Sequence, residues 1–213
     1  MRFGKALVAM TLALAILGAA SARAAENSWM GTAYVGYAKI IENSDNAKYS
    51  VPGGGLAIHG GAYRMLHPDM GLGLELGYQH YGEKDYVIPA EQQGTAGFSS
   101  VHLTLQALVQ GTHGTTRPLG TLGAGWYSLR TTTSGQLLLP DGTPIPGNHF
   151  EDKRNDSRFG ANLGFGLQFH PKNSSVLWGL EARGHAIFQG WPEKSGGTGT
   201  LNVLTLAAGI HFS

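Results

Sequence analysis

Residues 158–170 alternate without interruption between apolar side chains and small or polar ones. The apolar positions are Phe159, Ala161, Leu163, Phe165, Leu167 and Phe169, and the positions between them are Arg158, Gly160, Asn162, Gly164, Gly166, Gln168 and His170. A period of two is that of a β-strand. Bulky apolar groups on one side and mostly glycine and amide groups on the other are typical of a strand in a transmembrane barrel.

The same alternation recurs along the rest of the chain and predicts eight strands. Their expected ranges are 29–38, 53–66, 72–82, 98–111, 119–132, 158–170, 176–189 and 201–213. The connections alternate between long polar segments and short turns, which is typical of an up-and-down barrel with short periplasmic turns and longer outer loops. The predicted long loops are 39–52, 83–97, 133–157 and 191–200.

The predicted fold is therefore all-β: one eight-stranded antiparallel up-and-down transmembrane β-barrel. An even number of strands leaves both chain ends on the short-turn side, so the first and last strands can pair and remove every sheet edge. Composition agrees, because charged residues make up only 14% of the chain and its mean hydropathy is -0.10. A barrel whose strands face lipid on one side and the lumen on the other gives such an intermediate value.

The first 24 residues have the features of a cleaved signal peptide. Arg2 and Lys5 supply a basic start, residues 6–20 an apolar run, and Ala22-Arg23-Ala24 a cleavage site of small residues. Two segments are thus expected, a signal peptide at 1–24 and a barrel domain at 25–213.

Removal of the signal changes the charge of the chain. It takes three of the 15 basic residues and none of the 14 acidic ones, so the formal charge falls from +1 to -2. This value does not suggest nucleic-acid binding. The chain has no cysteine, so an exported fold would be stabilised by barrel closure and not by disulfides.

Four segments carry a resemblance to a known family. They are residues 119–130 (LGTLGAGWYSLR), 159–167 (FGANLGFGL), 180–185 (LEARGH) and 206–212 (LAAGIHF). With the eight strands placed, the mature chain resembles the small outer-membrane β-barrel family, which includes the membrane domain of OmpA and OmpX. The resemblance implies the outer membrane of a Gram-negative-type bacterium, with outer-membrane lipid and lipopolysaccharide as neighbours. It also implies the barrel-assembly machinery as a partner, although Phe212 is followed here by Ser213 where such proteins usually end on an aromatic residue.

Three charged residues are predicted to meet inside the barrel. Alternation turns Glu75, Glu181 and Arg183 inward, and Glu181 and Arg183 share one face of one strand. Buried charges are tolerated only when paired and hydrogen-bonded. We therefore expect a lumenal charge network of these three residues, with Gln79, Gln106 and Asn162 as further partners.

No catalytic, cofactor or metal site is predicted. His170 and Ser174 lie together in a short turn, where ordinary turn chemistry explains them. The inward residues His59, His102, His185 and His211 lack the spacing of a metal site. Glycines such as Gly160, Gly164 and Gly166 alternate within a strand, so we interpret them as space for lumenal side chains and not as a phosphate loop.

The sequence thus favours a non-enzymatic outer-membrane barrel with an envelope-structural or surface-interaction role carried by its outer loops. Two alternatives stay open: a lipid A-modifying barrel enzyme, and a soluble lipocalin-like barrel. The soluble barrel would place its large apolar residues inward. The surface ligand, if there is one, cannot be read from loop composition.

Overall fold

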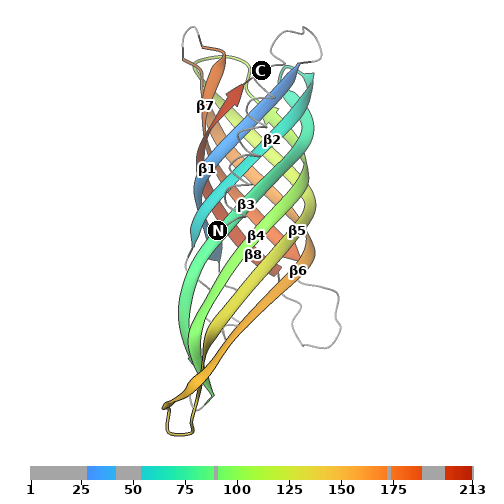
Figure 1. Cartoon of the computed structure of the whole chain (residues 1–213). Coiled ribbons are helices and arrows are strands. Elements are labelled where there is room, and N and C mark those ends of the chain that lie inside the picture. Colours follow the sequence, from blue (N-terminus) through green and yellow to red (C-terminus); the bar gives the residue numbers. More distant parts are fainter. Residues whose placement is uncertain (1–27, 42–53, 89–90, 172–173, 189–199, 213) are drawn as a thin grey trace.

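The computed structural model is a closed antiparallel barrel of eight strands in chain order (Figure 1). It describes residues 28–41, 54–88, 91–171, 174–188 and 200–212. The strands are β1 (Trp29–Ile41), β2 (Gly55–His67), β3 (Met70–Ile88), β4 (Gln92–Gln110), β5 (Thr116–Leu138), β6 (Pro144–Phe169), β7 (Val176–Phe188) and β8 (Thr200–Phe212). The predicted signal peptide and most of the predicted loops 39–52 and 191–200 lie outside the described residues. No helix in the described part is long and apolar enough to cross a membrane.

Strand β1 closes the ring by pairing with β8 along its length, from Gly31 opposite Phe212 to Ile41 opposite Asn202. The first and last strands therefore have no free edge within the barrel, as the sequence predicts. The end of the barrel at which β2 leads into β3 has short turns: only Pro68 and Asp69 lie between these two strands.

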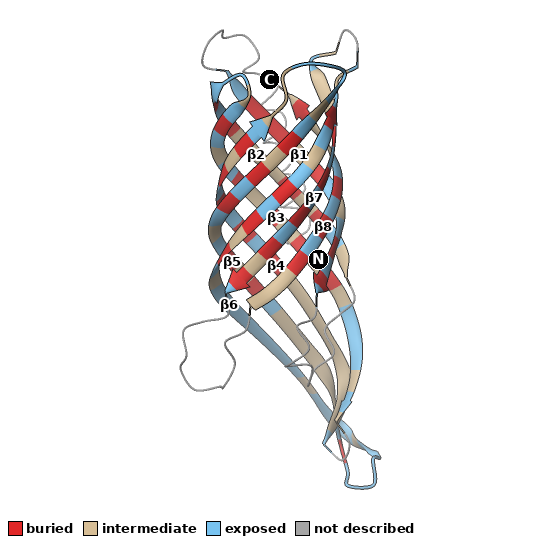
Figure 2. Ribbon diagram, turned by 180° about the vertical axis from the view of Figure 1, so that it is seen from behind, coloured by how far each residue is buried: buried red, intermediate tan, exposed pale blue. Residues whose placement is uncertain are grey.

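Within the closed part of the barrel, burial alternates along the strands in the way the sequence predicts (Figure 2). On β6, Phe159, Phe165 and Phe169 are exposed, whereas Asn162 and Gln168 between them are buried. Alternation turns six aromatic residues outward. Trp29, Tyr37, Trp126 and Trp178 are more than half exposed, and Tyr78 and Phe212 are partly exposed. Large apolar groups thus cover the outside of the barrel, and polar groups fill the middle of its lumen. This excludes the soluble lipocalin-like alternative, which needs the opposite arrangement.

Two predicted loops are wrong, because their residues form strands. Segment 83–97 continues β3 and β4, and segment 133–157 continues β5 and β6, so that Asp85 pairs with Thr95 and Thr133 with Asp152. Both faces of these extensions are polar or partly exposed. They therefore lack the apolar alternation that marks a strand in lipid, although cross-strand hydrogen bonds still form.

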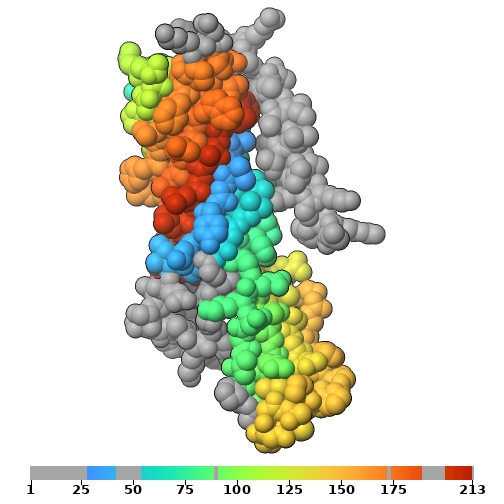
Figure 3. Space-filling model, turned by 90° about the vertical axis from the view of Figure 1, so that its left-hand side faces the viewer, coloured from blue at the N-terminus to red at the C-terminus, as the bar shows by residue number. Residues whose placement is uncertain are grey.

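The extended strands make a four-stranded sheet that projects beyond the rest of the barrel, as Figure 1 shows in green to orange at the bottom. We call this part of β3–β6, residues 83–99 and 130–157, the projecting sheet. Figure 3 shows it standing clear of the end of the described β1, β7 and β8. The hairpin tips lie between Ile88 and Gln92 and between Leu138 and Pro144.

Apolar side chains fill the lumen near both ends. At the short-turn end the cluster consists of Met30, Tyr63, Met65, Leu108 and Leu119. At the end next to the projecting sheet it consists of Ala38, Ile40, Ala57, Tyr81, Tyr127, Leu129, Ile187 and Val203, with Phe98 and Leu201 packed against it. An eight-stranded barrel has an interior just wide enough for side chains to fill. The described lumen has this filled character.

We therefore expect no stable, large single-channel conductance from this protein in planar bilayers. A refolded porin of 16 strands, measured in parallel, controls for the bilayer. Long-lived openings comparable to those of the porin would show that the two apolar clusters do not close the lumen.

Candidate functional site

The polar centre of the lumen is built around Arg183 of β7. Its Nε donates a hydrogen bond of 2.6 Å to Oε1 of Glu181, two residues away on the same strand. Its Nη1 donates to Oε1 of Glu75. Arg183 is 2% exposed, Glu75 1% and Glu181 5%. The structure thus brings together the three charged residues that the sequence places on the lumenal face.

The ion pair between Arg183 and Glu75 spans the interior of the barrel. In the ring, β3 and β7 are separated by three strands in each direction. No backbone hydrogen bond can link these two strands, so side chains are what connects the opposite walls at this level. The network of Glu75, Glu181 and Arg183 therefore links opposite walls of the barrel through the lumen, and we call it the cross-tie.

Neutral donors and imidazole rings surround the two carboxylates. Gln106 donates to Oε1 of Glu75 at 3.4 Å, and the Thr121 hydroxyl donates to Oε1 of Glu181 at 3.2 Å. Nε2 of His102 lies 3.5 Å from Glu75, and Nε2 of His59 lies 3.9 Å from Glu181. Each carboxylate therefore has an imidazole beside it as well as the guanidinium.

The predicted amide partners divide between two groups. Gln106 contacts Glu75 directly and also donates to Asn162 at 2.9 Å. Gln79 contacts neither carboxylate: its amide nitrogen lies 3.1 Å from Nε2 of His185, and its carbonyl accepts from the hydroxyls of Tyr81 and Ser100. Sequence reasoning missed the positions of His59 and His102 beside the carboxylates. Alternation placed both inward, but strand register alone decides which carboxylate each one meets.

Glycines make the space that the network needs. A Cβ added at Gly164 would clash with Oε1 of Glu181 and Oγ1 of Thr121, and one at Gly77 would clash with the ring of His102. A Cβ at Gly160 would press on the Tyr127 ring at 2.8 Å. This confirms the interpretation of Gly160 and Gly164 as space for lumenal side chains. At Gly166 the nearest atom is the backbone carbonyl of Leu180, so there the constraint is close strand approach.

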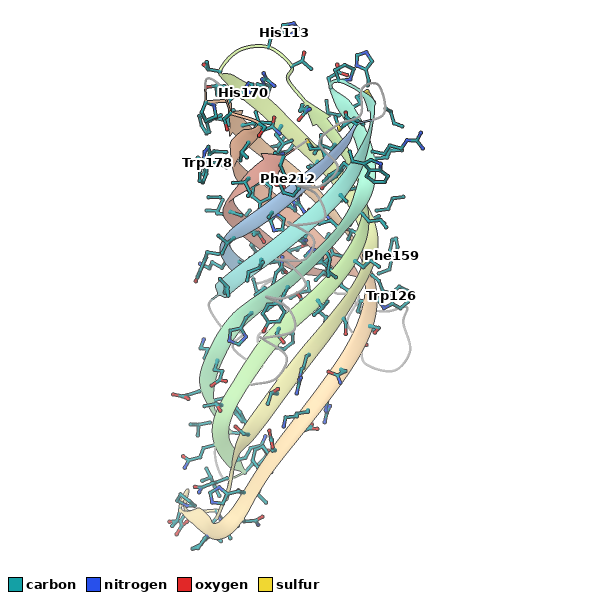
Figure 4. All side chains as sticks on the ribbon, turned by 45° about the horizontal axis from the view of Figure 1, so that its top comes forward. His113, Trp126, Phe159, His170, Trp178 and Phe212 are labelled. Atoms are coloured by element: carbon teal, nitrogen blue, oxygen red, sulfur yellow. The ribbon has the colours of Figure 1, made fainter. Side chains whose placement is uncertain are left out.

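The short-turn pair His170 and Ser174 has the geometry of a turn and not of a nucleophile with its base. Arg117 lies 3.0 Å from Nδ1 of His170, and the backbone carbonyl of Ser174 lies 3.0 Å from Nε2. The Ser174 hydroxyl instead donates to the carbonyl of Val176 and accepts from its amide. Nucleophilic catalysis needs a hydroxyl bonded to the base that activates it. Figure 4 shows His170 beside the short turns, with His113 at the same end.

No group of three or more His, Cys, Asp or Glu side chains in the described ranges is arranged to hold a metal ion.

The outside of the barrel has the height of a membrane. The outward residues of β6 are apolar from Phe159 to Phe169 and polar at Ser157 and Asn155. Ten residues of strand at about 3.3 Å each, tilted by about 40°, span roughly 25 Å, which is the height of the apolar band of outer-membrane barrels. Trp126 and Phe159, which are register partners on β5 and β6, lie four residues before the row of Arg130 and Asn155, where the projecting sheet begins (Figure 4).

A closed eight-stranded ring with an apolar exterior and a polar, filled interior defines a transmembrane β-barrel of the outer-membrane type. The sequence comparison gives the family: residues 10–212 match the outer membrane protein beta-barrel domain, and the chain belongs to this family. No curated protein matches the sequence significantly.

Solved structures with the same fold include Neisserial surface protein A. That protein is 15% identical, with 86% of this chain and 96% of that chain covered and a TM-score of 0.51. A major outer membrane protein from Thermus thermophilus is 14% identical, with 87% of this chain and 99% of that chain covered and a TM-score of 0.50. At these identities the likeness concerns the fold alone.

The first prediction from this site concerns the space at Gly164. Replacing Gly164 with Ala should destabilise the barrel by roughly 1–3 kcal/mol, because the added methyl group pushes on Glu181 and Thr121. Urea unfolding in detergent micelles measures the change. Gly184→Ala is the matched control, since its added Cβ faces outward and meets nothing closer than the Leu163 carbonyl at 4.0 Å. Equal stability of the two variants would contradict the packing argument.

The second prediction concerns the cross-tie itself. Arg183→Ala should cost roughly 3–5 kcal/mol, because it leaves two carboxylates buried without their cation. The triple change Glu75→Gln, Glu181→Gln, Arg183→Met removes all three charges and should recover much of that loss. Heat-modified gel mobility follows unfolding of each variant.

Arg158→Ala serves as the control for the cross-tie. Arg158 also pairs with an acid, Asp156, but both side chains are partly exposed, and such pairs contribute at most about 1 kcal/mol. If Arg183→Ala unfolds at the wild-type temperature, the three charges are merely hydrated and do not stabilise the barrel as a unit.

Proposed function

We propose that this protein is a non-enzymatic outer-membrane barrel that holds a rigid sheet outside the cell for contact with a partner. The observation that carries the proposal is the projecting sheet. Four strands continue past the apolar exterior, while the described parts of β1, β2, β7 and β8 reach only Ile41, Gly55, Phe188 and Thr200 at this end. In this proposal residues 1–24 are removed on export, the short turns lie in the periplasm, and lipopolysaccharide and the assembly machinery are the envelope partners.

Hydrogen bonds between side chains and at the hairpin tip hold the projecting sheet in one conformation, which supports a recognition role. Its central strands are joined across the outer face, where the hydroxyls of Thr95 and Ser134 hydrogen-bond at 3.1 Å. The tip between β5 and β6 is also held: the Thr143 amide donates to the Asp141 carboxylate at 2.9 Å, which lowers the pKa of that carboxyl below its ordinary value. A surface that is already ordered loses less conformational entropy on binding.

The composition of the sheet also fits contact with a polar partner. Its faces carry both signs of charge, with Lys153 paired to Glu151 and Arg154 to Asp152 along β6. Within the described residues β6 has no strand partner on its outer side before Gly160. An edge with alternating charges is one way in which proteins prevent unspecific strand pairing, so specificity would come from the side chains.

The alternative of a lipid A-modifying enzyme has no comparable support. His170 and Ser174 lie at the short-turn end and do not hydrogen-bond through the hydroxyl. Across β3 and β4, His80 and Ser99 are register partners near the outer end of the apolar exterior, but no hydrogen bond between these two described residues joins them. A nucleophile without its base does not support acyl transfer.

Orientation gives one test. An epitope inserted after Gly142 should bind antibody on intact cells, because Gly142 lies at the hairpin tip with no atom within 4 Å of an added Cβ. The same epitope at Gly114, in the turn before β5, should bind only after the outer membrane is opened. The reverse result would place the projecting sheet in the periplasm and end the proposal.

A shortened barrel tests the role itself. Deleting 86–94 and 135–150 removes the outer half of the sheet and leaves the lumen intact. Cells without other adhesins that express the full chain should adhere to immobilised matrix glycoprotein, and cells with the shortened, heat-modifiable barrel should not. If instead the shortened chain restores detergent resistance to a deletion strain and adhesion never depends on the sheet, the protein has the envelope-structural role.

A further inference from the structure

One row of polar side chains crosses the outer face of the barrel where the projecting sheet begins. Its members are His80 on β3, Ser99 on β4, Arg130 on β5 and Asn155 on β6, which are successive register partners. Alternation puts all four on the outer face of the barrel, the face that carries exposed apolar residues nearer the short-turn end. Arg130, for example, follows Trp126 and Ser128 on that face, and Trp126 is 57% exposed.

The row lies just beyond the apolar exterior. Two rows closer to the middle of the barrel, Leu103, Trp126 and Phe159 are register partners with their side chains outward. Two residues of strand advance about 7 Å along the strand. The polar row is four residues from the aromatic row, which is about 13 Å along the strand. At a tilt of about 40° it therefore lies roughly 10 Å above the aromatic level, in the layer of lipid headgroups outside the hydrocarbon core.

Arg130 has no partner within the described part of the molecule. It is exposed, and it makes no hydrogen bond or ion pair with another described residue. Its cationic neighbours on β6 differ, since Lys153, Arg154 and Arg158 are paired with Glu151, Asp152 and Asp156. Of this group only Arg130 and Lys153 share the lipid-side face, because Arg154 and Arg158 continue the lumenal face.

The groups beside Arg130 can complete a site for an anion. Ser99 and Asn155 flank it in the row with a hydroxyl and an amide, and Lys153 is the diagonal neighbour on β6. A guanidinium fork binds phosphate oxygens in pairs, and neutral donors can satisfy the remaining oxygens. Three acids share this face: Glu151, which is paired with Lys153, Glu83, whose side chain lies against Gly97, and Asp85, which is opposite Thr95. None of these three described acids is paired with Arg130. Arg130 is thus the cation left available.

We propose that Arg130, with Ser99 and Asn155, binds a phosphate group of lipid A in the outer leaflet. The site is on the lipid side of the strands and at headgroup height, which is why a membrane lipid is the occupant and not a free anion. The inference rests on the orientation given under the proposed function, with the projecting sheet outside. It adds a lipid contact at the base of the sheet, separate from any partner that the sheet itself binds.

The experiment titrates the refolded full barrel in detergent with fluorescent lipopolysaccharide. Arg130→Gln should weaken binding roughly tenfold, the size expected for losing a hydrogen-bonded charge pair. Arg130→Lys should recover part of the loss, because it keeps the charge without the fork. Arg154→Gln is the matched control, with the same charge change one strand away on the opposite face.

Two further arms identify the source of the phosphate. Dephosphorylated lipid A should bind the wild type as weakly as lipopolysaccharide binds Arg130→Gln. Inorganic phosphate should not compete with lipopolysaccharide. Equal weakening by Arg154→Gln, unchanged binding of dephosphorylated lipid A, or full competition by inorganic phosphate would each overturn the assignment. The titration does not depend on adhesion or on epitope exposure, so its failure is distinguishable from failure of the proposed function.

Discussion

Closure of the sheet is the constraint on which the rest of this structure depends. Lipid offers no hydrogen-bond partner to a free strand edge, so β1 must pair with β8 along the membrane-spanning length. Closing only eight strands leaves a narrow interior, and every lumenal position must then fit its neighbours across the barrel. The glycines at 77, 123 and 164 follow from this, because each lies against a larger lumenal group: His102, Gln106 or Glu181. In a lumen this narrow, a large side chain on one strand therefore requires a glycine on the strand next to it.

The fold was predictable wherever lipid and lumen impose opposite demands on neighbouring residues. All eight strands and their facing were predicted for this reason, and the errors fall where that contrast ends. At Thr133 and Asp152 both faces of the sheet meet a polar surrounding, so the residue types no longer show which segments pair. Strands β5 and β6 nevertheless continue, because the register of the membrane part runs without a shift through Thr133 and Asp152.

The candidate site was predictable to a similar degree and for a similar reason. Alternation places Glu75, Glu181 and Arg183 on the lumenal face, and the narrowness of the barrel then brings them within reach. Alternation does not give height along the axis. That is why the sequence could not say that His102 stands beside Glu75, or that Gln79 belongs with Tyr81 and Ser100 instead. Heights depend on the stagger between strands, which only the register supplies.

The arginines show how one side chain takes different roles in the two parts of this barrel. Arg183 is enclosed between two apolar clusters, where a charge without its partners would be costly, so its effect is to hold opposite walls together. Arg154 pairs with Asp152 in water, where the pair contributes little to stability but keeps the edge of β6 charged. Arg130 is exposed at the boundary between these surroundings, and no described neighbour neutralises it. In the proposed orientation, lipid headgroups lie within reach of its guanidinium, and a membrane lipid is the anion that we propose it binds. Arginine thus occurs in the core, at the surface and at the membrane interface of this barrel. The local dielectric decides whether each guanidinium stabilises the fold or remains available for binding.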